Sequence, residues 1–118
     1  MSADEQYVEQ YARAHLVTGA ADGHRAVPVV LRYGGDGQVR VALPAPEGEW
    51  TFPRELLERG LRAPVTGGDI RIWPCGRVQA VIEFHAREGV AVVQFDVKAL
   101  IRFLRRTYTA ATPVTSTG

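Results

Sequence analysis

The sequence EWTFPRELLERGL, residues 49–61, changes within a few positions from the apolar spacing of a strand to that of a helix. Residues 49–52 are expected to form a short strand. Pro53 then occupies the place of a first helical residue, and Gly60 occupies the place where the helix should stop. The leucines that would share one face of this helix are Leu56, Leu57 and Leu61. A helix of about two turns is too short to be stable unless it packs on a sheet.

The residues before this stretch show strand periodicity. Apolar and polar side chains alternate over residues 7–17 and again over residues 26–33. The turn Gly34-Gly35-Asp36-Gly37 supplies positions of positive φ, and the alternation resumes at residues 39–43, which predicts a hairpin. Pro28 cannot donate a ladder hydrogen bond, so its strand is expected at a sheet edge or with a bulge there.

Three more strands are expected after the short helix, at residues 69–73, 78–86 and 90–95. The last two are expected to form a hairpin that turns at residues 87–89. The main apolar face of this hairpin is predicted to hold Val78, Ala80, Ile82, Phe84 and Ala86. The opposite face is predicted to hold Val81, Ala91, Val93 and Phe95. Both faces would then need burial, and an interface between subunits could cover the second one.

A long helix is predicted over residues 97–108, with Asp96 as its N-cap. Its apolar stripe is predicted to contain Val97, Leu100, Ile101, Leu104 and Tyr108. Phe103 lies roughly 100° from the centre of this stripe and is therefore expected to be exposed. Exposed aromatic and arginine side chains are typical of interface hot spots, so Phe103, Arg102 and Arg106 are the candidate partner-binding residues. Two alternatives exist for these arginines: a solvated face, which is the ordinary state of a charge run, and a nucleic-acid contact.

Together these elements predict an α+β fold of mostly antiparallel sheet, with about seven strands, a short helix and a long C-terminal helix. The chain has 118 residues, of which 46% are apolar and 23% charged, which indicates one globular domain. That domain is expected over residues 7–109, between a frayed N-terminus at 1–6 and a flexible tail at 110–118. No apolar run is long enough for a membrane span and the start is no signal peptide. The single cysteine, Cys75, excludes an internal disulfide, so a cytoplasmic location is expected.

The residue types that carry catalysis occur without the spacing that catalysis needs. The metal-ligating candidates are His15, His24, His85 and Cys75, and no pair of them has ligand spacing. The only serines, Ser2 and Ser116, lie near the chain ends and are poor candidates for a nucleophile. The glycine-rich turns lead into strands, whereas a phosphate cradle needs a following helix. No enzyme activity, metal or cofactor is therefore expected.

Aromatic side chains on the sheet could stack on the bases of single-stranded nucleic acid. The candidates are Tyr11, Tyr33, Trp50, Trp73 and Arg71. The alternative for the two tryptophans is packing, as core or edge anchors. The chain has 14 basic and 13 acidic side chains, so it lacks the basic excess that dominates nucleic-acid affinity. A protein partner is therefore favoured over a nucleic acid.

An ordered set of residues runs through the middle of the chain. It comprises Trp50, Phe52, Arg54, Leu56, Leu57, Gly60, Leu61, Pro64 and the run Gly67-Gly68-Asp69-Ile70-Arg71-Ile72-Trp73-Pro74. This set resembles the SsgA-like proteins, which are sporulation and cell-division regulators of actinobacteria. Leu31-Arg32-Tyr33 and Phe103-Leu104-Arg105-Arg106-Thr107 are also similar to the family, so the resemblance covers residues 8–109. On physical grounds the matched residues are mainly packing and turn positions.

The resemblance implies a fold like the whirly-type single-stranded nucleic-acid binders, a homotrimer and no catalysis. It also implies a role in positioning or assembling sporulation septa, where the best known member recruits FtsZ. The expected partners are therefore FtsZ or another SsgA-like protein, at division septa. Typical members continue into an acidic segment after the last helix, and its role is not transferred here. Two hypotheses stand: a cell-division adaptor that acts through protein contacts, and a regulator that binds single-stranded nucleic acid on its sheet.

Overall fold

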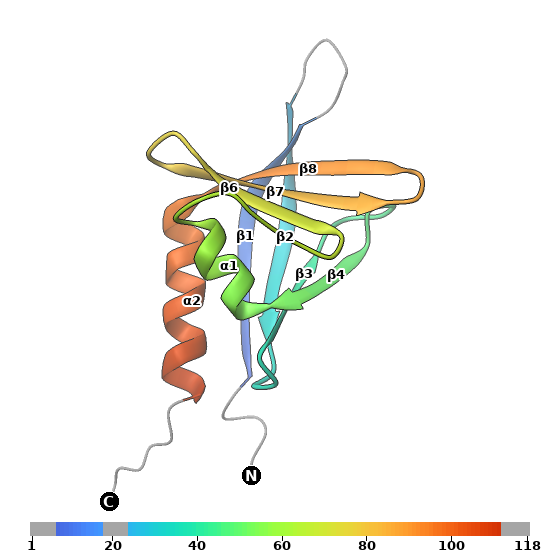
Figure 1. Cartoon of the computed structure of the whole chain (residues 1–118). Helices are drawn as coiled ribbons and strands as arrows, with labels where there is room; N and C mark the ends of the chain where they lie inside the picture. Colours follow the sequence, from blue (N-terminus) through green and yellow to red (C-terminus); the bar gives the residue numbers. More distant parts are fainter. Residues whose placement is uncertain (1–6, 18–23, 112–118) are drawn as a thin grey trace, which may run out of the picture.

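The computed structural model describes residues 7–17 and 24–111, which form one eight-stranded sheet and two helices (Figure 1). The elements in chain order are β1 (Val8–Val17), β2 (His24–Tyr33), β3 (Gln38–Ala42), β4 (Glu49–Pro53), α1 (Arg54–Gly60), β5 (Val65–Gly67), β6 (Ile70–Cys75), β7 (Gln79–Ala86), β8 (Gly89–Asp96) and α2 (Val97–Ala111). Every strand pair is antiparallel, in the order β4-β3-β2-β1-β8-β7-β6-β5. The predicted fold class is confirmed, with eight strands instead of about seven.

The additional strand is β5, whose three residues were too few to show a period. α2 extends to Ala111, two residues into the predicted tail. The rest of that tail and the predicted frayed N-terminus at 1–6 lie outside the described residues.

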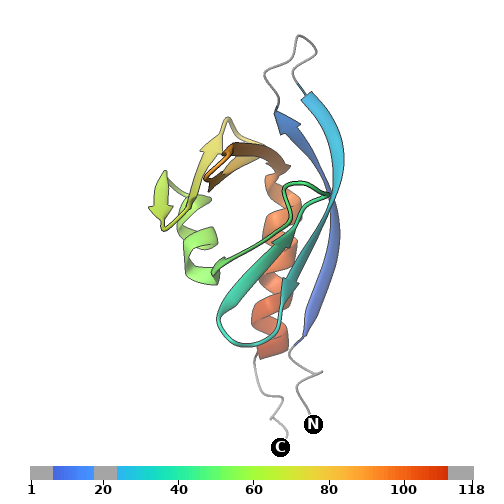
Figure 2. The same ribbon diagram turned by 90° about the vertical axis from the view of Figure 1, so that its right-hand side faces the viewer.

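The sheet is sharply bent where its two halves meet. β1 pairs with β2 along its whole length, but it pairs with β8 only from His15 to Val17. As a result β7 and β8 run across the direction of β1 and β2 (Figure 1). The two helices lie on the side that this bend encloses (Figure 2). Their buried residues join the inner faces of both halves of the sheet in one core.

Pro28 was expected on an edge strand, and it lies on an inner strand at a point where one neighbouring strand has ended. β2 is an inner strand of the sheet, between β1 and β3. Its pairing with β3, however, runs only from Val30 to Tyr33, so Pro28 lies beyond the end of that ladder and needs no donor toward β3. A strand can therefore be internal to a sheet and still accept a proline where its neighbour is shorter.

α1 packs tightly against β6 at its C-terminal end. Pro53 is extended, with φ −63° and ψ 142°, so it caps the helix rather than forming its first residue. Gly60 is the last helical residue, and it is buried. A Cβ atom there would overlap the side chain of Ile72. The glycine is therefore required by the close approach of the helix to the sheet.

The predicted faces of the last hairpin are partly wrong. In the register of β7 and β8, Ala80 lies opposite Phe95, Ile82 opposite Val93 and Phe84 opposite Ala91. Directly opposed residues share a face, so Ala91, Val93 and Phe95 belong to the main apolar face. The loop between Ala86 and Gly89 is one residue shorter than the predicted turn at 87–89. A register shift of one residue transfers every side chain of a strand to its other face.

The second face of this hairpin is mixed in character. Of the four apolar residues predicted there, only Val81 is present, and it is buried. Val90 and Val92 also lie on this face, among polar side chains such as Gln79 and Glu83. Two predicted members of the main face, Val78 and Ala86, are exposed. Ala91, Val93 and Phe95 therefore pack toward the core of the same chain and do not form a second apolar face.

The buried side of α2 differs from the predicted stripe. Phe103 is 0% exposed and belongs to the core, whereas Tyr108 is 46% exposed. The prediction of an exposed Phe103 is therefore wrong. The other fully or largely buried residues of this helix are Leu100, Leu104 and Thr107. The physical reason is that packing against the sheet buries the Phe103 ring in the core. The Gln10 side-chain amide also donates to the Ala99 carbonyl at 2.9 Å, which links the helix to β1 in this rotation.

Asp96 acts as the predicted N-cap of α2. Its carboxylate oxygen Oδ1 accepts the backbone N–H of Lys98 at 2.9 Å. This bond satisfies one of the N–H groups that a helix leaves unpaired at its start.

Candidate functional site

The three residues proposed to bind a partner on α2 have different environments. Phe103 is in the core, so this surface has no aromatic anchor at that position. The Arg106 guanidinium donates from Nη1 to the Glu9 carbonyl at 3.1 Å and to the Gln10 side-chain oxygen at 3.3 Å. Arg106 therefore fastens α2 to β1. Arg102 and Arg106 are both exposed, so these two of the three predicted residues are open to solvent.

Arg54 connects three elements of the fold. Its guanidinium lies 4.8 Å from the centre of the Tyr33 ring and 3.9 Å from that of the Tyr108 ring. Its Nη1 also donates to the Thr107 hydroxyl at 3.3 Å. These contacts join α1, β2 and α2 through cation–π attraction and one hydrogen bond. These contacts give the guanidinium of the half-buried Arg54 partners inside the fold.

The other residues of the matched motif lie mostly in packing positions. Those that are buried are Phe52, Leu56, Leu57 and Gly60. Those that are half-buried are Trp50, Trp73 and Pro74. Trp73 lies under the Arg71 guanidinium, which is 5.1 Å from the ring centre.

The aromatic residues considered for base stacking do not form one platform. Tyr33 is buried on the inner face of the sheet, and Trp50 points to the same face. Tyr11 is 74% exposed on the outer face. The strand register places Trp73 and Arg71 on the outer face too, but in the other half of the sheet.

Two arginines on the outer face of the first half of the sheet, Arg32 and Arg40, are paired with carboxylates. Arg32 is paired with Glu9 at 3.1 Å and with Glu49 at 3.3 Å. The hydrogen bond to the Glu9 carboxylate, with a smaller contribution from Tyr7, raises the pKa of Arg32. Arg40 is paired with Asp36 at 3.1 Å. Such pairing reduces the positive potential that would attract a phosphate backbone.

The histidines and the cysteine do not assemble into a metal site in the described ranges 7–17 and 24–111. No group of three or more His, Cys, Asp or Glu side chains there is placed to hold a metal ion. His85 instead contacts Glu83, with 2.9 Å between Nε2 and Oε1.

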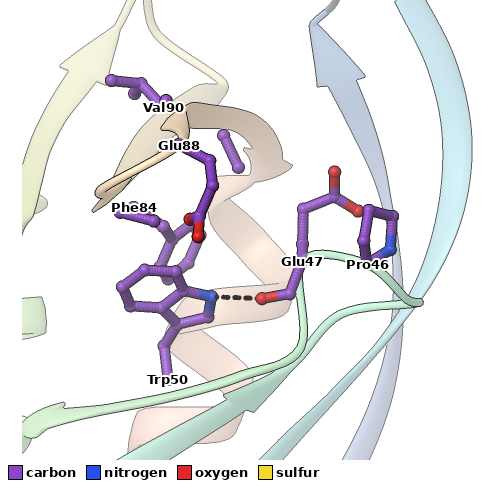
Figure 3. A pocket seen from close by; sticks show the side chains of 9 residues that line it. Pro46, Glu47, Trp50, Phe84, Glu88 and Val90 are labelled. Carbon is purple, nitrogen blue, oxygen red and sulfur yellow. Dashed lines mark hydrogen bonds between the residues drawn. The ribbon is translucent and has the colours of Figure 1, made fainter.

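A hollow of about 550 Å³ lies between the β3–β4 turn and the β7–β8 hairpin. We call it the Trp50 groove, and its principal residues are Pro46, Glu47, Trp50, Phe84, Glu88 and Val90 (Figure 3). The Trp50 indole N–H donates to the Glu47 carbonyl at 2.8 Å, which holds the ring in place. Its ring centre is 5.4 Å from that of Phe84, in a tilted arrangement.

Sequence reasoning identified Trp50 as an anchor but did not identify this groove. Its charged residues, Glu47 and Glu88, lie in two turns that are far apart in the chain. A carboxylate in a turn is ordinary, so only the folded arrangement shows that both border one apolar surface.

Comparison with known sequences identifies related proteins. A family model described as "Streptomyces sporulation and cell division protein, SsgA" matches residues 27–115. The sporulation-specific cell division protein SsgB of Kineococcus radiotolerans is 35% identical over 89 residues, which cover 68% of this chain and 54% of that protein. The protein of the same name from Streptomyces coelicolor is 40% identical over 70 residues, covering 57% and 51%. The chain thus spans about half the length of the curated relatives it matches.

Two solved structures have a similar fold. One comes from work on SsgB mutations that correlate with longitudinal cell division during sporulation of Streptomyces coelicolor. It superposes with a TM-score of 0.79 at 32% identity, covering 88% of this chain and 86% of that one. The other is an SsgA-like sporulation-specific cell division protein from Thermobifida fusca, with a TM-score of 0.73 at 31% identity, covering 92% and 85%. The similarity therefore extends to sequence as well as fold.

Proposed function

This chain belongs to the SsgA family of sporulation and cell division proteins, and from that premise we propose that it is a non-enzymatic adaptor that holds a protein partner at sporulation septa. The observation that carries the proposal is the family match over residues 27–115. The relatives named as sporulation-specific cell division proteins support the cellular process.

The surface of the molecule supports a binding role over turnover. The Trp50 groove offers a preformed apolar hollow, a common feature of binding sites. On the outer sheet face, Arg32 and Arg40 are paired with carboxylates. Arg102 and Arg106 remain as proposed contacts for a partner, without an exposed Phe103 beside them.

FtsZ or another SsgA-like protein is the proposed partner, at division septa. A homotrimer is the proposed assembly, by resemblance to the family. The half-exposed Val90, near Val92 on the second face of the last hairpin, supports some contact between subunits. No helix in the described part of the chain is long and apolar enough to cross a membrane. Light scattering tests the assembly: a mass near 12.9 kDa, that of a monomer, would contradict it.

The second candidate function is binding of single-stranded nucleic acid on the outer sheet face. The observation in its favour is the exposed Tyr11, with Arg13 following on the same face. The balanced charge opposes it, since phosphate contacts supply most of such affinity. A mobility-shift assay at low salt with single-stranded DNA and RNA discriminates the two: a clear shift, lost in Tyr11→Ala, would favour this second function.

The adaptor proposal is tested in sporulating cells. Deletion of the gene is expected to misplace or abolish sporulation septa, and the intact gene is expected to restore them. Affinity purification of the tagged full chain from the same cells is expected to recover a division protein. Normal septa in the deletion strain would overturn the proposal.

A further inference from the structure

The floor of the Trp50 groove is apolar and has a fixed shape. The hydrogen bond to the Glu47 carbonyl satisfies the only polar group of the Trp50 indole, so the rest of the ring is an apolar contact surface. Phe84 supports it from below, and Ala86 and Ala91 line the groove beside it. Trp50 is only half-buried, so one side of its ring faces the open groove. An apolar side chain of a ligand could cover that side. This surface has the form of a binding subsite.

Two carboxylates border this floor. Figure 3 shows the Glu88 side chain reaching toward the Trp50 ring, with Glu47 on the other side of the groove. In the described part of the chain, no ion pair involves either of them. An aromatic floor beside unpaired carboxylates is complementary to a long basic side chain, whose methylene stem packs on the ring while its charge meets the carboxylates.

The backbone of β8 offers a donor and an acceptor at the same place. The Val97 N–H donates to the Val78 carbonyl at 2.9 Å, so this pair is hydrogen-bonded. Hydrogen-bonded and non-hydrogen-bonded pairs alternate along an antiparallel ladder. By that alternation Val90, opposite His85, turns its N–H and C=O away from β7. The His85 N–H agrees with this, because it donates to Asp69 on the other side of β7.

Among the described residues, no strand occupies that edge of β8 at Val90. β1 pairs with β8 only at Val92, Val93 and Gln94. The outward N–H and C=O of Val90 could pair with an extended chain, whose side chains on one face would enter the groove.

We propose that the Trp50 groove binds an extended, basic segment of a protein partner, in which an arginine or lysine alternates with apolar side chains. The basic side chain lies over Trp50 between Glu47 and Glu88, and the backbone of the segment pairs with Val90. This proposal rests on the adaptor function, which sets where in the cell the partner would be bound. The binding itself is a property of the isolated chain and is tested without reference to septation.

The test uses the full chain and two synthetic peptides. In the first, arginine alternates with valine and leucine; in the second, glutamate replaces each arginine. Binding is followed by amide and indole NMR shifts, and by tryptophan fluorescence in a Trp73→Phe background. The arginine peptide is expected to shift the Trp50 indole N–H and the amides from Glu88 to Ala91, more weakly at higher salt. Equal binding of the glutamate peptide, or shifts confined to other surfaces, would overturn the proposal.

Three variants make the test specific. Glu47→Gln with Glu88→Gln is expected to weaken the arginine peptide at least about 10-fold, in the range for losing close charge pairs. The matched control, Glu55→Gln with Glu58→Gln on α1, removes the same charge and is expected to bind as the wild type. Val90→Pro removes the outward N–H without breaking a bond to β7, so it should fold and yet lose affinity.

Circular dichroism and the thermal midpoint establish that each variant folds. If the groove variant (Glu47→Gln with Glu88→Gln) and the control variant on α1 both fold and bind the arginine peptide equally well, the proposed binding mode is wrong. It is also wrong if Val90→Pro binds the peptide as tightly as the wild type. A failure of both peptides overturns the groove proposal and leaves the septation phenotype unaffected. A normal deletion strain overturns the adaptor function and leaves the peptide result unaffected. The two failures are therefore distinguishable.

Discussion

Phe103 on α2 and Trp50 on β4 are both large aromatic side chains, and they stand in opposite environments. Phe103 is enclosed by the core, whereas Trp50 forms the floor of an open groove. α2 is held against β1 by hydrogen bonds from Gln10 and Arg106. The β3–β4 turn and the β7–β8 hairpin, in contrast, meet without a helix over them (Figure 3). Binding of a partner is therefore expected at the groove, where an aromatic surface is accessible.

Truncation of Phe103 tests the closed side of this comparison. Phe103→Ala is expected to lower the free energy of unfolding by about 3–5 kcal/mol, because it removes a fully buried ring and leaves a cavity. Urea denaturation measures the change, and Arg102→Ala, one residue away and exposed, is the control with an effect within about 0.5 kcal/mol. A small loss of stability in Phe103→Ala would show that the ring is not in the core.

The packing of α1 on β6 gives the next effect. Gly60→Ala is expected to destabilise the protein by about 1–3 kcal/mol, because the added methyl group overlaps Ile72 and the helix must move. Gly34→Ala is the matched control, since a Cβ there meets only the end of the Arg40 side chain at an ordinary distance of 3.7 Å. Equal melting temperatures for the two variants would contradict the close approach.

Truncation of Trp50 separates stability from binding at the open side. Trp50→Leu is expected to cost about 1–2 kcal/mol, less than Phe103→Ala, because the ring is only half-buried. The same variant is expected to lose binding of the arginine peptide. If it destabilises the fold as much as Phe103→Ala and still binds the peptide, the distinction between the two sides fails.

The smallest effect is expected at the turn between β2 and β3. The hydrogen bond from the Gln38 N–H, together with the Arg40 guanidinium, lowers the pKa of Asp36. A carboxyl whose pKa is lower in the folded state stabilises the fold above its unfolded pKa, and this contribution is lost as the pH falls through the folded pKa. Asp36→Asn should therefore be slightly less stable than the wild type near neutral pH.

At acid pH, once the carboxyl of Asp36 is protonated in both states, the difference should disappear. Thermal unfolding measured from neutral pH downward follows this convergence. Asp69→Asn is the control, because no hydrogen bond or ion pair of its carboxylate occurs within the described residues. A difference for Asp36→Asn that persisted at acid pH would contradict the role of the charge.

Most strands and both helices were predictable because their signals are local. Alternation and the turn at residues 34–37 predicted the first hairpin, and Pro53, Gly60 and Asp96 marked the helix ends. β5 gave no such signal, since its three residues are held by pairing with β6. The faces of the last hairpin were predicted wrongly because its loop is one residue shorter than expected. This difference moves every side chain of β8 to the opposite face of the sheet.

The residue pattern alone thus predicted the order of the elements other than β5, the antiparallel α+β class and the family resemblance, because each depends on neighbours in the chain. The rotation of α2 and the Trp50 groove depended on distant contacts. Phe103 packs into the core although the periodicity of the helix placed it outside the stripe, and Gln10 bonds to Ala99 across 89 positions in the same arrangement. Glu47 and Glu88 come together only because the sheet bends between β1 and β8. A helix pattern describes which residues share a side, and the packing partners decide which side is buried.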